Sequence, residues 1–293
     1  MRILHLDAGR EMRGGQWQVL RLLNGLAAAG VEVSLLARAG APLFEAARKR
    51  GWNMAPLGLP RVAWEARRHD LVHAHDARTH TMAALSGGAP LVVARRVAFP
   101  VVSRWKYGRP RRYIAVSDFV RSVLQAGGVS EEKIDVVYDG VPLLEPASGS
   151  AVLAPANAGD PQKGAALAVE AARLAGVDLR LTDELERDLF SAACFVYLTR
   201  SEGLGSAALL AMSAAVPVVA SDVGGLREVI RHRENGLLVV NTAEAVAAAL
   251  RELAANPELA RRLGHAGRQT VQERFTIDIM VRKTIETYHK VLA

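Results

Sequence analysis

The sequence contains a single cysteine, Cys194, so the chain cannot form an internal disulfide. It also lacks the paired cysteine spacing of a zinc site. A chain of this kind suits a reducing compartment, and we expect a cytoplasmic protein. The apolar stretch before Asp7 is too short for a secretory signal peptide, which agrees with that expectation.

Long apolar runs are scarce as well. The one conspicuous run, residues 203–221, has no charge and approaches the length of a membrane span. It contains two glycines, three serines and Pro217, which favour a helix followed by a buried strand over a spanning helix. We therefore expect no membrane span.

Acidic residues are missing from residues 95–112, which hold seven lysines and arginines. Residues 1–145 carry 21 Lys and Arg against 13 Asp and Glu, whereas the remainder carries 16 against 17. This basic half favours an anionic partner such as a phosphorylated glycan, an anionic lipid headgroup or nucleic acid. A solvated face that only keeps the protein soluble is the simpler alternative. For nucleic acid, no RNA-binding motif accompanies the basic run, and we expect none to bind.

Short apolar runs alternate with amphipathic runs along the chain, and the series restarts once. The expected strands are residues 2–7, 31–37, 71–74, 91–94, 113–116 and 133–137, then 151–154, 177–181, 194–198, 217–221 and 237–240. Helices are expected between them, including residues 16–29 and 183–193, and at the end over residues 242–255, 257–274 and 277–292. This order predicts two doubly wound parallel sheets, hence two Rossmann-like domains facing a cleft, joined near residues 142–150.

The loops after the strands are the expected places for chemistry, because ligands bind beyond the carboxyl ends of parallel strands. Gly14 and Gly15 precede a helix whose free amides would attract an anion. The loop is not GxGxxG, which disfavours a nicotinamide cofactor. Ordinary turn chemistry would explain the glycine pair equally well.

Two histidines, His73 and His75, lie at the end of the third strand of the first series, and Asp76 comes just after it. A histidine beside a carboxylate can be held in one tautomer and donate to a hydroxyl or phosphate. A structural role and a metal site are the alternatives, although no third metal ligand lies nearby in the sequence.

Lys163 is expected at the start of one helix of the second half, and Glu202 in the loop before another, which begins near Ser206. A lysine at a helix start is opposed by the helix dipole, so an anionic ligand beside Lys163 would relieve it. Gly203 and Gly205 would let a ligand approach the backbone closely, while Glu202 could accept hydrogen bonds from ligand hydroxyls. Plain dipole stabilisation by Glu202, or a solvated lysine, remains the simpler interpretation.

These motifs resemble, in order and spacing, the retaining glycosyltransferases of the GT-B fold, family four (glycosyl transferases group 1). The resemblance covers nearly the whole chain. It rests on RGG ending at Gly15, VHAHD ending at Asp76, QKG ending at Gly164, SEGLG ending at Gly205, and VPVVASDVGG ending at Gly225. Further matches are YIAVS ending at Ser117, VVYDGV ending at Val141, Ala211 with Met212, Glu228, NGLL ending at Leu238, and the last helix, residues 275–292.

The resemblance implies a nucleotide-sugar donor, for example a UDP- or GDP-sugar, with no metal and no covalent cofactor. It implies catalytic roles for His75 and Glu202. The implied donor-binding residues are Lys163, Glu202, Gly203, Leu204, Gly205, Ser206, Gly14 and Gly15. The side chains expected to face an acceptor or another anion are Arg13, Arg78, Arg95 and Arg96.

The implied domains are residues 1–145 for the acceptor, 146–275 for the donor, and a last helix over residues 276–293 that crosses back to the first domain. The acceptor would be a carbohydrate or a lipid-linked glycan. The basic first domain could then bring the protein to the inner face of a membrane as a peripheral protein.

Three departures from the family concern the nucleotide. Leu210 stands where the family has a second glutamate, commonly a ribose ligand, and Ala158 stands where an arginine often precedes the lysine. The second domain is also shorter by one or two strand–helix units. The alternative is therefore a non-catalytic relative that binds a partner or an anionic surface and has lost nucleotide-sugar binding.

Overall fold

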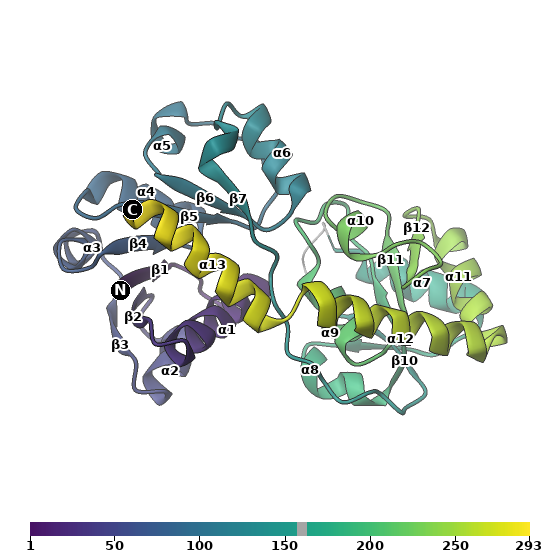
Figure 1. The fold of residues 1–293 in the computed structure, drawn as a ribbon. Helices are drawn as coiled ribbons and strands as arrows, with labels where there is room; N and C mark the ends of the chain where they lie inside the picture. Colours follow the sequence, from purple (N-terminus) through teal and green to yellow (C-terminus); the bar gives the residue numbers. More distant parts are fainter. Residues whose placement is uncertain (157–162) are drawn as a thin grey trace. The chain divides into compact units, whose positions relative to one another are not determined.

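The structure is a computed structural model that describes residues 1–156 and 163–293. The chain forms two compact units (Figure 1): unit 1 is Met1–Gly140 with Ile277–Ala293, and unit 2 is Val141–Thr276. The first boundary precedes the predicted one because the Val141 amide donates to the Phe275 carbonyl (2.9 Å) and so ties this segment to unit 2. Ala158 lies outside the described residues.

Unit 1 is built on a seven-stranded sheet in which every pair of neighbouring strands is parallel. The strand order is β3-β2-β1-β4-β5-β6-β7. The strands are β1 (Arg2–Asp7), β2 (Glu32–Ala37), β3 (Asn53–Pro56), β4 (Leu71–Ala74), β5 (Leu91–Arg95), β6 (Arg112–Ala115) and β7 (Ile134–Val136). The central strands are almost wholly buried, as expected for a parallel sheet covered on both faces.

Helices connect these strands and cover the sheet (Figure 1). They are α1 (Gly14–Ala28), α2 (Pro42–Lys49), α3 (Leu59–Ala66), α4 (Ala77–Ser86), α5 (Arg104–Gly108), α6 (Asp118–Ala126) and, from the far end of the chain, α13 (Ile277–Leu292). The buried leucines of α1 and the side chains of α13 share one core. The two helices approach closely at Gly25, where a Cβ would lie 2.4 Å from Val281 Cγ2.

Unit 2 has a smaller, five-stranded parallel sheet in the order β12-β11-β10-β8-β9. Its strands are β8 (Ala151–Pro155), β9 (Leu179–Thr182), β10 (Ala192–Tyr197), β11 (Val218–Ser221) and β12 (Leu237–Val239). Its helices are α7 (Ala165–Ala175), α8 (Leu185–Asp188), α9 (Ser206–Ser213), α10 (Leu226–Val229), α11 (Ala243–Ala255) and α12 (Pro257–Arg274). Between β9 at the sheet edge and the central β10 the chain forms only α8 and a short 3-10 turn.

The helix expected over residues 183–193 is wrong in extent. The segment contains only the single turn α8 and a short 3-10 turn, Leu189–Ser191. Thr182 accounts for this: its hydroxyl donates to Asp188 (2.6 Å) and accepts from the Glu184 amide (3.0 Å), which folds the chain back on itself. Side chains that bond nearby backbone in this way compete with helix formation.

No helix within the described ranges combines the length and the apolar composition needed to cross a bilayer. The uncharged run beginning at Gly203 instead forms α9 and β11, as the sequence predicts. All but one of the residues of α9 from Ala208 onward are fully buried, and β11 is a central strand of unit 2.

Candidate functional site

In unit 2, Lys163 and Glu202 meet beyond the carboxyl end of β10. The Lys163 Nζ lies 2.9 Å from Glu202 Oε2, and both side chains are largely buried. Backbone pairing places the lysine there, because Lys163 bridges to Thr199 and the Gly164 amide donates to the Leu198 carbonyl (2.9 Å). The structure thus brings together the two charged residues that the sequence singled out.

A third side chain, Tyr197, joins this pair and was not predicted. Its hydroxyl donates to the same Glu202 oxygen (2.5 Å) and accepts from Lys163 Nζ (3.1 Å). Tyr197 is the last residue of a buried apolar strand, so its residue type and position predicted a side chain packed in the hydrophobic core. Its hydroxyl reaches the glutamate because of the face of the strand on which Tyr197 lies and the path of the loop that follows.

The glycine loop between Glu202 and α9 is held in one conformation. Gly205 has φ +105°, which other residues rarely adopt, and a Cβ there would lie 2.5 Å from Leu226 Cδ2. The Gly225 amide donates to the Glu202 carbonyl (3.1 Å), and a Cβ on Gly225 would overlap the Gly203 carbonyl. The Glu202 carboxylate also accepts from the Gly203 amide (3.0 Å).

A polar network that joins the buried Thr199 and Ser221 to the exposed Asn241 supports this edge of the sheet. The Ser221 hydroxyl accepts from the Thr199 amide (2.9 Å) and donates to the Asn241 side chain (2.5 Å). Asn241 returns a hydrogen bond to the Thr199 carbonyl (2.9 Å). The ends of β10, β11 and β12 are therefore fixed to one another beneath the Lys163–Glu202 pair.

Leu204, Ser206 and Leu210 differ in the groups that they can offer a ligand. The Leu204 side chain is fully buried in unit 2, so the predicted contact of Leu204 with a donor would have to come from its backbone. Ser206 is the first residue of α9 and is half-buried. Leu210 packs into the core on the same helix, so this position offers a ligand no polar side chain.

In unit 1, the loop after β1 is organised by two carboxylates. Asp7 accepts from the Gly9 amide (2.8 Å) and from the Gln16 side chain (3.1 Å). Burial raises the pKa of Asp7, opposed by its hydrogen bond from Gly9. Asp76 caps α4 through the Arg78 and Thr79 amides and also accepts from the Ala8 amide (2.7 Å), which joins the β1 and β4 loops. Gly14 and Gly15 begin α1 beside this loop, with open space where a Cβ would stand.

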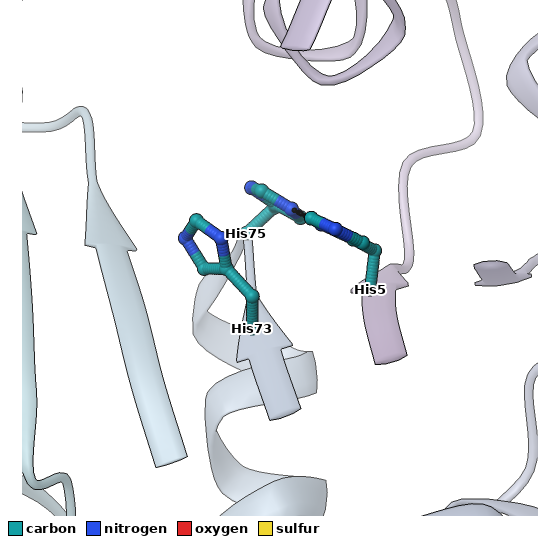
Figure 2. Close-up of side chains that lie close together, drawn as sticks. All are labelled: His5, His73 and His75. Atoms are coloured by element: carbon teal, nitrogen blue, oxygen red, sulfur yellow. Dashed lines mark hydrogen bonds between the residues drawn. The ribbon is translucent and has the colours of Figure 1, made fainter. Parts of the chain in front are cut away.

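Three buried histidines lie together at the centre of the same sheet (Figure 2). His5 pairs with His73 across β1 and β4, and His75 follows the end of β4. His5 Nδ1 lies 3.0 Å from His75 Nε2, and His73 Nδ1 lies 2.6 Å from the Tyr288 hydroxyl on α13. The sequence did not indicate His5, because it stands alone in an apolar strand.

An arginine fixes the proton positions in this cluster. An Arg96 N–H points at His75 Nδ1 (3.4 Å), and a guanidinium only donates, so His75 Nδ1 is the acceptor. Neutral His75 then carries its proton on Nε2 and donates to His5 Nδ1. Both ring nitrogens of His75 therefore have partners within unit 1, and the ring is buried, so it is not a free acid or base.

All three imidazoles are held neutral. Burial lowers the pKa of His5 to about 3, and burial with the neighbouring rings and Arg96 lowers the pKa values of His73 and His75 well below 6.5. The nearest ligand atoms of the three rings lie within 4.8 Å of one another, which could suit a metal. A metal on His75 Nε2 would, however, move the proton to Nδ1, where it would face the N–H of Arg96. The hydrogen bonds therefore favour a structural network over a metal centre.

The four arginines expected to face an anion differ in their settings. Arg95 is buried and its guanidinium donates to the Phe99 carbonyl (2.5 Å), so it is not exposed to an anion in solution. Arg96 is mostly buried in an ion pair with Asp139 (3.1 Å). Arg13 is exposed and paired with Glu11 (2.8 Å), and Arg78 is exposed at the start of α4.

Two protein families match the chain, one in each unit. The family described as "Glycosyltransferase Family 4" matches residues 12–143, and the family described as "Glycosyl transferases group 1" matches residues 179–270. Together the two matches include both glycine loops, Glu202, and His73 and His75 of the histidine cluster.

Curated relatives match over shorter stretches. The alpha-maltose-1-phosphate synthase of Mycolicibacterium smegmatis is 41% identical over 119 residues, which cover 38% of this chain and 31% of that protein. The putative glycosyltransferase EpsD of Bacillus subtilis is 44% identical over 70 residues, covering 24% of this chain and 18% of that protein. The chain thus spans about a third or less of the length of these relatives.

Solved structures match the fold over nearly the whole chain. HepE of Anabaena in complex with UDP has a TM-score of 0.86 at 16% identity, covering 99% of this chain and 100% of that chain. Sucrose-phosphate synthase of Thermosynechococcus elongatus has a TM-score of 0.80 at 19% identity, covering 99% of this chain and 98% of that chain. At such identities the likeness concerns the fold.

Proposed function

Since the chain belongs to the group 1 glycosyltransferases of the GT-B fold, we propose that it transfers a sugar from a nucleotide-sugar donor to an acceptor. The observation that carries this proposal is the cluster of Lys163, Tyr197 and Glu202 beside the glycine loop of unit 2. Several structural neighbours were solved with UDP or UDP-glucose, which supports a donor of that class.

Unused hydrogen-bonding capacity in the cluster suits a sugar diphosphate. The two described contacts of Lys163 occupy two of its three donors, which leaves one for a phosphate oxygen. Glu202 Oε1 accepts only its own loop amide among the described contacts, so it has a lone pair for a sugar hydroxyl. The start of α9, whose first turn carries no acidic residue, adds backbone amides and the positive end of the helix dipole.

In this proposal the chemistry is electrostatic. Lys163 and the α9 amides stabilise the diphosphate as it leaves, and Glu202 holds the sugar while positive charge develops on its ring. This lysine and these amides supply positive charge where a metal ion would otherwise be needed, so we propose transfer without a metal. We further propose that anomeric configuration is retained, as in the family that the motifs resemble.

For His75 we propose a supporting role in transfer as a neutral group. Its nitrogens are engaged with Arg96 and His5, so proton transfer would first require one of these contacts to break. The acceptor that we propose is an anionic glycan or a lipid-linked glycan, supported by the basic composition of residues 1–145.

Calorimetric titration with UDP-glucose and GDP-mannose tests the donor site. We expect one of these donors, or a related nucleotide sugar, to bind, and Glu202→Gln and Lys163→Met to weaken binding about ten- to hundredfold, because each removes a charge-assisted hydrogen bond. Glu252→Gln is the matched control, since it breaks an ion pair with Arg233 elsewhere in unit 2. Failure of every nucleotide and nucleotide sugar to bind would overturn the proposal.

Transfer itself needs a second measurement. Donor binding without hydrolysis or transfer, over a panel of glycan acceptors, would favour the non-catalytic alternative. With a product in hand, the anomeric proton coupling in NMR distinguishes retention from inversion. Activity that is abolished by EDTA and restored by a divalent cation would contradict metal-free transfer.

A further inference from the structure

The segment between β5 and β6, residues 97–111, exposes large apolar side chains. Val97, Phe99, Val102 and Trp105 are 42%, 66%, 92% and 48% exposed. They occur within nine consecutive residues, and we call the exposed side chains of this segment the 97–111 surface. Single exposed apolar residues are ordinary, but such a group marks an interaction site.

This exposure does not result from a loosely attached segment. The Phe99 carbonyl accepts from the buried Arg95, and Val101 packs against Gly127 at the end of α6, where a Cβ would lie 2.4 Å from Val101 Cβ. The Ser103 hydroxyl caps α5, and the Lys106 carbonyl lies 3.1 Å from His80 Nε2. Unit 1 thus holds the backbone at several points while the apolar side chains point outward.

The charge around these side chains has one sign. Arg104, Arg109 and Arg111 are exposed, and residues 95–112 contain no Asp or Glu. Lys106 Nζ donates to the Ala77 carbonyl (2.6 Å), which places the exposed Arg78 of α4 beside the same surface. Aliphatic, aromatic and basic groups therefore share one part of unit 1.

We propose that the 97–111 surface docks on an anionic phospholipid bilayer. Val102 and Phe99 enter the region between headgroups and acyl chains, Trp105 lies at the interface, and the arginines bind lipid phosphates. A nucleic acid would use the arginines and could stack on the aromatic rings, but it would gain nothing from the two valines. The combination favours lipid, and it rests on the surface of unit 1 rather than on the transfer reaction.

Vesicle flotation of the full chain tests the proposal. We expect binding to phosphatidylcholine vesicles that contain phosphatidylglycerol, and much weaker binding to phosphatidylcholine alone. Replacing Phe99 and Val102 together by serine should reduce binding by about tenfold or more, because two exposed apolar side chains no longer insert. The matched control replaces Phe190 and Val240 of unit 2, which are 67% and 64% exposed, by serine and should bind unchanged.

The charge contribution is tested separately. Replacing Arg104 and Arg109 by glutamine should weaken binding by about twentyfold, and added salt should weaken the wild type in the same direction. The same change at the exposed Arg261 and Arg262 of unit 2 is the control. Circular dichroism checks that each variant is folded.

Three outcomes would overturn the proposal: no binding to anionic vesicles, equal binding to both kinds of vesicle, or equal loss in the Phe190 and Val240 control. Binding to a DNA duplex or to RNA that disappears in the Arg104 and Arg109 variant, with no vesicle binding, would assign the surface to nucleic acid instead. Because vesicle binding needs no donor, a failed donor titration would leave this result standing, and the reverse also holds.

Discussion

At the scale of single residues, Tyr197 provides a test of how the candidate donor site is organised. Its hydroxyl shares one oxygen of Glu202 with Lys163. Tyr197→Phe removes that hydroxyl and leaves the charges in place. We expect five- to tenfold weaker binding of the donor, or about 1–1.4 kcal/mol, because one hydrogen bond that orients the glutamate is lost. Calorimetric titration measures the change.

Tyr138→Phe is the control for this substitution. The Tyr138 hydroxyl lies 3.4 Å from the Asp118 carboxylate in unit 1, so its loss should not alter donor affinity. Equal affinities for wild type and Tyr197→Phe would mean that Lys163 and the loop amide orient Glu202 without the tyrosine.

The residues that the sequence revealed are those with an unusual residue type for their position. Lys163 and Glu202 are charges beside glycine loops, and His73 and His75 are a pair at a strand end. Tyr197 and His5 lie in apolar strands, where the core was the better interpretation. His5 contacts His75, and Tyr197 contacts Lys163. Both contacts depend on the order of the strands and the path of the loops, which local sequence patterns do not specify.

At the scale of elements, the turn before α9 depends on Gly205. Gly205→Ala should lower the free energy of unfolding by about 2–4 kcal/mol, because the residue keeps a positive φ and its Cβ would overlap Leu226. Urea denaturation followed by circular dichroism measures the loss. Donor affinity should fall as well, since the loop cannot keep its path.

Two other glycines distinguish the cost of a positive φ from the cost of steric overlap. Gly176 has φ +71° with open space around it, so Gly176→Ala should cost only the backbone strain, about 1 kcal/mol. Gly15 lies in α1 with open space and no positive φ, so alanine there should be neutral or stabilising. A Gly205→Ala variant as stable as Gly15→Ala would show that the loop relaxes freely.

The contact between α1 and α13 makes a second prediction about elements. Gly25→Ala should destabilise unit 1 by about 1–3 kcal/mol, because the new methyl group would overlap Val281. Thermal unfolding followed by tryptophan fluorescence measures this. When Gly25→Ala is combined with Val281→Ala, the double variant should lose less unfolding free energy than the two single variants lose in sum. A loss equal to that sum would show that the helices do not meet at this position.

Element prediction from the sequence succeeded where the apolar pattern was clear and failed where elements are partly exposed. The central strands and the long helices were found because burial imposes a clear pattern over many residues. Strand β3 and helices α3 and α5 were missed, since they lie partly exposed and so show a weaker apolar pattern. The segment 183–193 shows the converse, in which a helical composition is overruled by the Thr182 and Asp188 side chains.

At the scale of the whole molecule, the two units should respond differently to acid. The buried histidines His5, His73, His75 and His80 all belong to unit 1, whereas unit 2 has only the exposed His232 and His265. A histidine whose folded pKa lies below 6.5 binds its proton more readily when unfolded. Its stabilisation is therefore complete above about pH 6.5 and is lost as the pH falls.

Between about pH 6.5 and pH 5 each such histidine costs unit 1 up to about 2 kcal/mol. Asp7, whose pKa burial raises, acts in the opposite direction at lower pH, so the window from pH 7 to pH 5 gives the clearest result. We expect unit 1 to lose stability there and unit 2 to change little.

The chain carries natural reporters for this experiment. All four tryptophans, Trp17, Trp52, Trp64 and Trp105, are in unit 1, and the only cysteine, the buried Cys194, is in unit 2. As the pH falls, urea should shift the tryptophan emission at lower concentrations, while the accessibility of the thiol to dithiodipyridine should change little. His5→Asn should reduce this acid sensitivity, and His232→Asn should not. Parallel transitions of both reporters would contradict unit-selective destabilisation.

The return of α13 to unit 1 has a consequence for the order of events during synthesis. Unit 2 is one uninterrupted stretch, whereas unit 1 is split by the whole of unit 2. A ribosome therefore delivers every residue of unit 2 before the helix that carries Tyr288, the partner of His73. Because domains fold as units while they emerge, unit 2 can reach its native packing first. Unit 1 is thus completed last although its seven strands are translated first, and the face of its sheet that α13 covers stays exposed until unit 2 has been made.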